Sequence, residues 1–170
     1  KYLDELVAGN NNANMTAVML MESLIGTGGA SRALGASLED TITAVGILAN
    51  NGTKASKAGT AMNSIFTRLA TNSKAQDALA EIGADIFDAE GNFIGLRESI
   101  IKIDEALKGM STEERTGYLK NIAGTHYFSQ MEYLLDSVRD GANGAASAWD
   151  TLESEIENSN GALDKMNTQS

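Results

Sequence analysis

Residues 35–70, which read GASLEDTITAVGILANNGTKASKAGTAMNSIFTRLA, carry two successive helical patterns and decide the fold class. Ser37-Leu38-Glu39-Asp40 is typical of a helix start, with acidic residues in the first turn, and Asn51-Gly52 is typical of a helix end. Between these signals apolar side chains recur at helical spacing, at Leu38, Ile42, Val45 and Leu48. A second helix is predicted over about 56–69 by the apolar residues Ala58, Ala61, Met62, Ile65, Phe66 and Leu69. Two adjacent amphipathic helices predict a mainly α fold.

The chain beyond this stretch continues as short helices that end at glycines. The predicted segments are 73–82 before Gly83, an apolar stripe over 100–107 before Gly109, a helix opened by Ser111 and closed by Gly124, and about 125–139. Isolated helices of this length are only marginally stable, so packing against other helices must supply most of their stability. We therefore expect a compact multi-helix bundle, in which the small residues Ala58-Gly59-Thr60 let another backbone approach closely.

Residues 85–94 interrupt the helical pattern. Two short apolar pairs flank Ala89-Glu90-Gly91, and this arrangement predicts one small β-hairpin with Gly91 in the left-handed conformation. The acidic residues here also suggest calcium, but an EF-hand loop counted from Asp88 would place Phe93 where glycine is required. The segment is interpreted as a solvated turn.

A different pattern follows the glycine-rich residues 141–144. Apolar side chains take alternating three- and four-residue steps with one polar interruption, at Trp149, Leu152, Ile156, Leu163 and Met166. This seam predicts a C-terminal helical extension that could pack on a partner helix. We expect a compact core module over 1–144 and an acidic heptad-like helix over 145–170. The chain begins with Lys1, so it is expected to be a segment of a longer protein.

Composition excludes several chemistries. The 170 residues contain no cysteine and a single histidine, so disulfides, cysteine-ligated metals and two-histidine metal sites are impossible. Their formal net charge of −10 repels nucleic acid phosphates and anionic lipid. No apolar run approaches the ~20 residues that span a bilayer. His126 is expected to be a partly exposed capping or packing residue and not a catalyst.

Three stretches together resemble the core region of bacteriophage tail tape measure proteins. They are residues 35–70, residues 81–100 (EIGADIFDAEGNFIGLRESI) and residues 121–135 (NIAGTHYFSQMEYLL), and the resemblance covers about residues 3–140. The residues that match the family's recurring elements are Asn51, Gly52, Ala58, Gly59, Thr60, Gly83, Asp88, Gly91, Asn92, Phe93 and Gly124. One departure lies at 123–126, where relatives tend to have Phe-Gly before small or basic residues.

The resemblance implies a structural protein of a phage or prophage virion. Such proteins lie in the tail tube lumen, template tail length during assembly in the host cytoplasm, and leave the tube ahead of the DNA. It implies the tail tube protein, tail assembly chaperones, tail-tip or baseplate proteins and other copies of the chain as partners. No catalytic residue, cofactor, metal, specific nucleic acid or membrane contact is expected.

Two other functions stay open from the sequence. A helical adaptor would bind a partner helix through the C-terminal seam. A peptidoglycan hydrolase would need two carboxylates on opposite sides of a sugar-binding cleft, yet few aromatic residues are present to line one.

Overall fold

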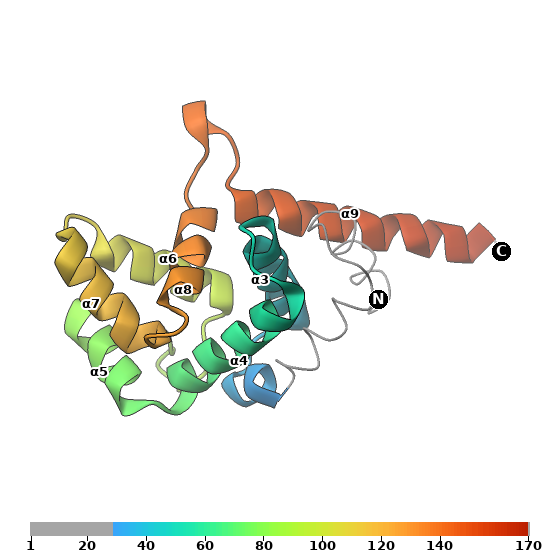
Figure 1. Ribbon diagram of the computed structural model, residues 1–170. Coiled ribbons are helices and arrows are strands. Elements are labelled where there is room, and N and C mark those ends of the chain that lie inside the picture. The colour runs from blue at the N-terminus through green and yellow to red at the C-terminus, as the bar shows by residue number, and fades with distance from the viewer. Residues whose placement is uncertain (1–28, 170) are drawn as a thin grey trace.

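A computed structural model describes the backbone of residues 29–169 and the side chains of residues 29–158 (Figure 1). The described part of the chain is mainly helical, as the sequence predicts. Its elements are a short helix at residues 29–34, α3 (Leu38–Asn50), α4 (Ala55–Thr71), α5 (Ser73–Ile82), α6 (Leu96–Leu107), α7 (Thr112–Ala123), α8 (Phe128–Ser137), the 3-10 helix η1 (Ala142–Gly144) and α9 (Ala148–Gln169).

Helix α3 lies at the centre of the molecule. All eight residues from Thr41 to Leu48 are buried, so this helix is covered on every side over two turns. It packs against α4, α8, α9 and the start of α6, whereas α5 and α7 lie side by side at the far end of α4 (Figure 1). Helix α4 buries the predicted apolar face, which consists of Ala58, Ala61, Met62, Ile65, Phe66 and Leu69. One continuous hydrophobic core therefore joins the helices.

Side-chain and glycine caps set the ends of these helices. Ser37 Oγ accepts a hydrogen bond from the N–H of Asp40 at 3.1 Å, and Ser111 Oγ accepts one from the N–H of Glu114 at 3.2 Å. Helix α5 occupies the predicted residues 73–82 and ends at Gly83, whose φ of 75° and ψ of 21° are left-handed. The local signals in the sequence thus predict these boundaries correctly.

The predicted β-hairpin at 85–94 is wrong, because the described residues contain no β-strand. One isolated antiparallel bridge joins Phe87 to Phe93, and the N–H of Asp88 donates to the carbonyl of Asn92 at 2.8 Å. The carboxylate of Asp88 accepts the N–H groups of Glu90 and Asn92, and these local bonds favour a turn. The N–H of Ile94 donates to the carbonyl of Ile86 at 3.0 Å, and α6 begins two residues later at Leu96.

The glycine at the end of α7 changes the predicted course of the next helix. Gly124 has a φ of 89° and a ψ of 158°, so the chain turns before α8 begins at Phe128. His126 lies in this turn, is exposed, and packs edge-on against Tyr127. The helix predicted over about 125–139 is thus shorter, since α8 spans only Phe128–Ser137.

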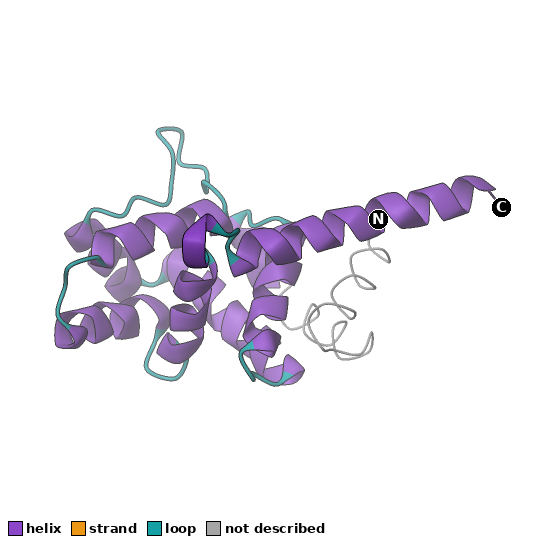
Figure 2. Cartoon of the chain, turned by 90° about the horizontal axis from the view of Figure 1, so that it is seen from above, coloured by secondary structure: helices purple, strands orange, loops and turns teal. Residues whose placement is uncertain are grey.

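Helix α9 is the longest helix of the described chain, and its 22 residues span about 33 Å. Its first turns pack against α3, and its remaining length projects away from the body of the molecule (Figures 1 and 2). The predicted helical extension is present. The first turns of α9 attach residues 145–156 to the core. The predicted boundary at residue 144, between a core module and a C-terminal helix, stays a prediction.

Candidate functional site

The family-motif residues, which match the family's recurring elements, lie at helix ends, within α4 and in one turn. Asn51 caps α3, and its side-chain amide donates to the carbonyl of Ile47 at 2.8 Å. Gly52 follows with a φ of 90°, which favours glycine. Within α4, Ala58 and Gly59 are buried, but Thr60 is exposed and its hydroxyl donates to the carbonyl of Ser56.

The motif residues of the 85–94 segment form the turn described above. Gly91 has a φ of 82°, and Asp88 and Asn92 hold the turn through backbone hydrogen bonds. Phe93 packs its ring against Phe87, with 6.2 Å between ring centroids, and both rings contact the core. The motif residues therefore shape the fold at separate places, and they do not converge on one described pocket.

Arg68 of α4 binds the end of α7, beside Gly124. Arg68 donates from Nε to the carbonyl of Ile122 at 3.2 Å and from Nη2 to that of Asn121 at 2.6 Å. A β-carbon at Gly124 would lie 3.5 Å from the Arg68 side chain. A cation at a helix C-terminus is favourable, because the last carbonyls carry partial negative charge. Arg68 thus closes α7 across a sequence separation of more than fifty residues.

The α9 base, residues 147–156, is the part of the predicted seam that the structure describes. Trp149, Leu152 and Ile156 are 0%, 4% and 2% exposed, and α9 packs here against α3. These three positions are therefore covered by the chain's own core. Leu163 and Met166, the other two positions of the seam, lie outside the residues whose side chains the structure describes.

An ion pair joins the α9 base to α6. Arg97 donates from Nε and Nη2 to the two carboxylate oxygens of Asp150 at 2.9 and 3.1 Å, which is the bidentate geometry that suits a guanidinium. The hydrogen bond from Arg97 lowers the pKa of Asp150. Ser147 caps the same turn, since its Oγ accepts the N–H of Asp150 at 3.1 Å. The first turn of α9 is thus attached to α6 as well as to α3.

Two further carboxylates lie beside this pair. Burial raises the pKa of Asp40, although the nearby backbone N–H groups of Arg97 and Leu96 act to lower it. Burial, and then the negative charge of Asp40, raise the pKa of Glu153 on α9. The α9 base therefore combines one favourable ion pair with one unfavourable acidic pair.

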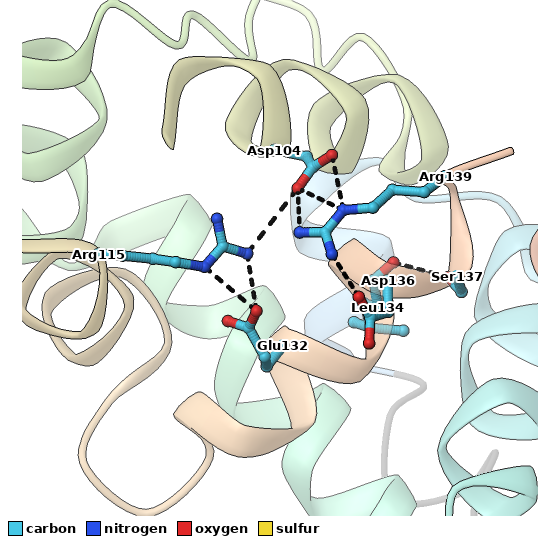
Figure 3. Close-up of polar contacts among 7 residues, drawn as sticks. All are labelled: Asp104, Arg115, Glu132, Leu134, Asp136, Ser137 and Arg139. Atoms are coloured by element: carbon cyan, nitrogen blue, oxygen red, sulfur yellow. Dashed lines mark hydrogen bonds and ion pairs between the residues drawn. The ribbon is translucent and has the colours of Figure 1, made fainter. Parts of the chain in front are cut away.

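A second cluster of charges joins α6, α7 and α8, and we call it the Asp104 network (Figure 3). Arg139 donates from Nε and Nη2 to the carboxylate of Asp104, with Nη2 2.7 Å from Oδ1. Arg115 Nη2 lies 3.8 Å from Asp104 and 2.7 Å from Glu132. Arg139 also pairs with Asp136. Asp104 is only 5% exposed, so its pairing with arginine compensates the loss of hydration.

The position of Asp104 in the sequence could have identified it as a buried, paired carboxylate. The sequence contains no comparable signal for the other charged contacts. Asp104 directly follows Ile103 on the apolar stripe of α6, where a carboxylate requires a cationic partner. Arg68, Arg97, Arg115 and Arg139 are each separated from a partner by 17 or more residues. Only the packing of the helices identifies such partners.

The grooves of the described surface are lined by mixed apolar and charged residues. A groove of about 500 Å³ beside the end of α5 is lined mostly by apolar residues, with Asp85 as its one carboxylate. A charged groove of about 370 Å³ beside α6 contains Asp104, whose oxygens already accept three hydrogen bonds from Arg139. Among the described residues, no group of three or more potential ligands could hold a metal ion. The charged side chains hold helices together.

Comparison with known proteins identifies the family of the chain. A family model described as "Phage-related minor tail protein" matches residues 1–124. A "Tape measure protein" of Pneumococcus phage Dp-1 is 34% identical over 137 residues, which cover 80% of this chain and 11% of the relative. A "Probable tape measure protein" of Escherichia phage P2 is 32% identical over 112 residues, which cover 63% of this chain and 14% of the relative. No solved structure matches the chain.

The chain thus spans about a tenth of the length of these relatives. The family match and both relatives agree with the resemblance carried by residues 35–70, 81–100 and 121–135. This chain belongs to the phage-related minor tail protein family and is similar over most of its length to tape measure proteins of phage tails.

Proposed function

We propose that this segment is a non-enzymatic module of a tape measure protein that lies in the tail tube lumen, helps to template tail length during assembly, and leaves ahead of the DNA during ejection. The observation that carries the proposal is the 34% identity to a tape measure protein over 80% of the chain. A structural role in the phage tail follows from the family itself.

The fold supports a compact module in preference to an extended ruler segment. Helices α5 and α8 have ten residues each, and helices shorter than about 12–15 residues are marginal without tertiary packing. Long-range contacts, such as those of Arg68 with α7 and of Arg139 with Asp104, would be lost in an extended chain. We therefore propose that residues 29–144 with the α9 base form a globule, and that the rest of α9 starts a helical extension.

The charge of the chain supports its place in a tube that DNA later occupies. A net charge of −10 repels the phosphate backbone, so the segment would not be retained by the following DNA. None of the described helices is both long and apolar enough to cross a bilayer. We propose the tail tube protein, the assembly chaperones, tail-tip or baseplate proteins and other copies of the chain as partners, with assembly in the host cytoplasm.

Tail length tests the proposal directly. In the phage or prophage that encodes this chain, the gene segment for residues 29–144 would be deleted, and the tails measured by electron microscopy. As one continuous helix these residues would span about 170 Å at about 1.5 Å per residue. A compact module predicts tails shortened by much less than this length, whereas shortening by the full length would contradict it. In the reciprocal experiment the same gene segment is duplicated and the tail length is measured again.

Small-angle X-ray scattering of the isolated chain provides an independent test. The proposed globule with a projecting helix predicts a compact scattering profile with a limited extension. A rod-like profile over the whole chain would contradict the compact module without affecting its membership of the family.

The projection of α9 favours a second candidate, a helical adaptor that acts through the outer part of this helix. Leu163 follows Ile156 by one heptad and Met166 follows three residues later, so both continue the register of the buried seam beyond the body (Figure 2). The oligomeric state of the chain, measured with and without residues 159–170, tests this role. An unchanged molar mass would count against it.

A further inference from the structure

Three Asn-Gly pairs occur in the chain, at 51–52, 143–144 and 160–161. An asparagine before glycine can lose its side-chain amide without an enzyme. The backbone nitrogen of the glycine attacks the asparagine Cγ, a C–N bond forms, and the side-chain nitrogen leaves as ammonia. Water then opens the cyclic succinimide to aspartate or isoaspartate. The reaction requires that both groups be free to approach each other.

The first pair is held in place at the end of α3. The side-chain amide of Asn51 donates to the carbonyl of Ile47 at 2.8 Å, and the N–H of Gly52 donates to that of Ala49 at 3.0 Å. Both reacting groups are thus engaged, although Asn51 is exposed. Ring closure there would require the last turn of a buried helix to open.

The third pair lies within α9. Gly161 is in the interior of this helix, where each N–H donates to the carbonyl four residues earlier. An intact helix therefore keeps the attacking nitrogen of Gly161 in a backbone hydrogen bond.

The second pair lies in the loop that joins α8 to α9. Residues 139–146 are all exposed, and the loop projects from the body of the molecule (Figure 1). Asn143 has a φ of 58° and Gly144 a φ of 77°, and both belong to the single 3-10 turn η1. The Asn143 side chain makes no hydrogen bond with the described residues, so it is free to rotate toward the Gly144 nitrogen.

We propose that Asn143 is a site of spontaneous deamidation in the folded protein, and that Asn51 and Asn160 are protected by their helices. Each event replaces a neutral amide with a carboxylate and adds one negative charge to the loop, which already contains Asp140. Opening of the ring to isoaspartate also inserts a methylene into the backbone between Arg139 of the Asp104 network and the α9 base. The modification thus alters the connection between the globule and its projecting helix.

Peptide mapping tests the proposal. The folded 170-residue chain is incubated at physiological temperature, at neutral and at mildly alkaline pH, and its tryptic peptides are followed by mass spectrometry. Fragment ions distinguish Asn143 from Asn160 within the peptide 140–165, and isoaspartyl methyltransferase labels the isoaspartate product. We expect Asn143 to react at least about tenfold faster than Asn51, since two hydrogen bonds must break at Asn51.

Two controls separate the role of the fold from that of the sequence. In concentrated urea the protection is lost, so the rates at the three pairs should converge. Asn143→Gln should remove most of the methyl-accepting isoaspartate, because a glutamine forms the larger cyclic imide more slowly. A rate at Asn51 or Asn160 in the folded chain that equals or exceeds the rate at Asn143 would overturn the proposal, as would an unreacted Asn143.

Discussion

Arg139, just after α8, binds the buried carboxylate of Asp104 on α6, with Nη2 2.7 Å from Oδ1 (Figure 3). This pair connects the α6–α8 side of the globule to the segment that leads into α9. The carboxylate also lies 3.8 Å from Arg115 on α7, so one buried acid serves three helices. Substituting Asp104 alone can therefore measure how much these helix contacts contribute to the free energy of unfolding.

We expect Asp104→Asn to lower the free energy of unfolding by about 2 kcal/mol, because two arginines lose a charged partner. Urea unfolding followed by circular dichroism measures the change. Lys108→Gln is the matched control, since Lys108 is an exposed charged residue at the end of the same helix, and should have almost no effect. A combined Asp104→Asn, Arg139→Gln variant should be less destabilised than the sum of the single changes. Strict additivity would contradict a direct coupling.

Gly124→Ala should destabilise the chain by about 1–3 kcal/mol, because a φ of 89° with a ψ of 158° is a conformation for glycine alone. The added methyl would lie at ordinary van der Waals distance from Arg68, so the backbone conformation is the source of the cost. Gly117→Ala in the same helix is the control, because Gly117 has open space and helical geometry, and it should stabilise by up to about 1 kcal/mol. A melting temperature that falls for Gly124→Ala and rises for Gly117→Ala would verify both predictions. Equal effects would contradict the role of Gly124.

These two sites illustrate what the sequence could predict. Ser37, Ser111 and the glycines after helices act within one turn, so their sequence spacing predicted the helix ends. The predicted hairpin failed because Asp88 satisfies the N–H groups of Glu90 and Asn92 locally. The contacts of Arg68 and Arg139 depend on how distant helices pack, which no local pattern encodes. The seam was predicted from its apolar residues, but its burial at Trp149 depends on the position of α3.

Glu153→Gln should stabilise the chain at neutral pH, and the gain should diminish in acid. Burial and Asp40 raise the pKa of Glu153, so the folded state binds this proton more tightly than the unfolded state. The stability of the parent chain therefore increases as the pH falls through the raised pKa, whereas glutamine carries no charge at any pH. Urea midpoints from neutral pH downward measure the difference. Glu155→Gln, at an exposed position of the same helix, is the control.

Asp150→Asn should show the opposite pH dependence. The hydrogen bond from Arg97 lowers the pKa of Asp150, so the ion pair stabilises the folded state above the pKa of the unfolded state. This contribution is lost as the pH falls through the lowered pKa. The variant should be less stable than the parent at neutral pH and should approach it in strong acid. If the variant and the parent chain differed in unfolding free energy by the same amount at every pH, the ion pair of Arg97 and Asp150 would not be the source of the difference.

The last prediction compares two leucines of the seam, one at the α9 base and one beyond the body. Leu152 is 4% exposed in the core, so Leu152→Ala should cost about 2–5 kcal/mol of unfolding free energy. Leu163 belongs to the C-terminal third of α9, the helix whose end projects from the body in Figure 2, so we expect Leu163→Ala to change that free energy in dilute solution by less than about 0.5 kcal/mol. If the outer seam binds a second copy, the same variant should weaken self-association, which sedimentation at increasing protein concentration measures. Equal destabilisation by both substitutions in dilute solution would contradict this division, because it would place Leu163 in the chain's own core.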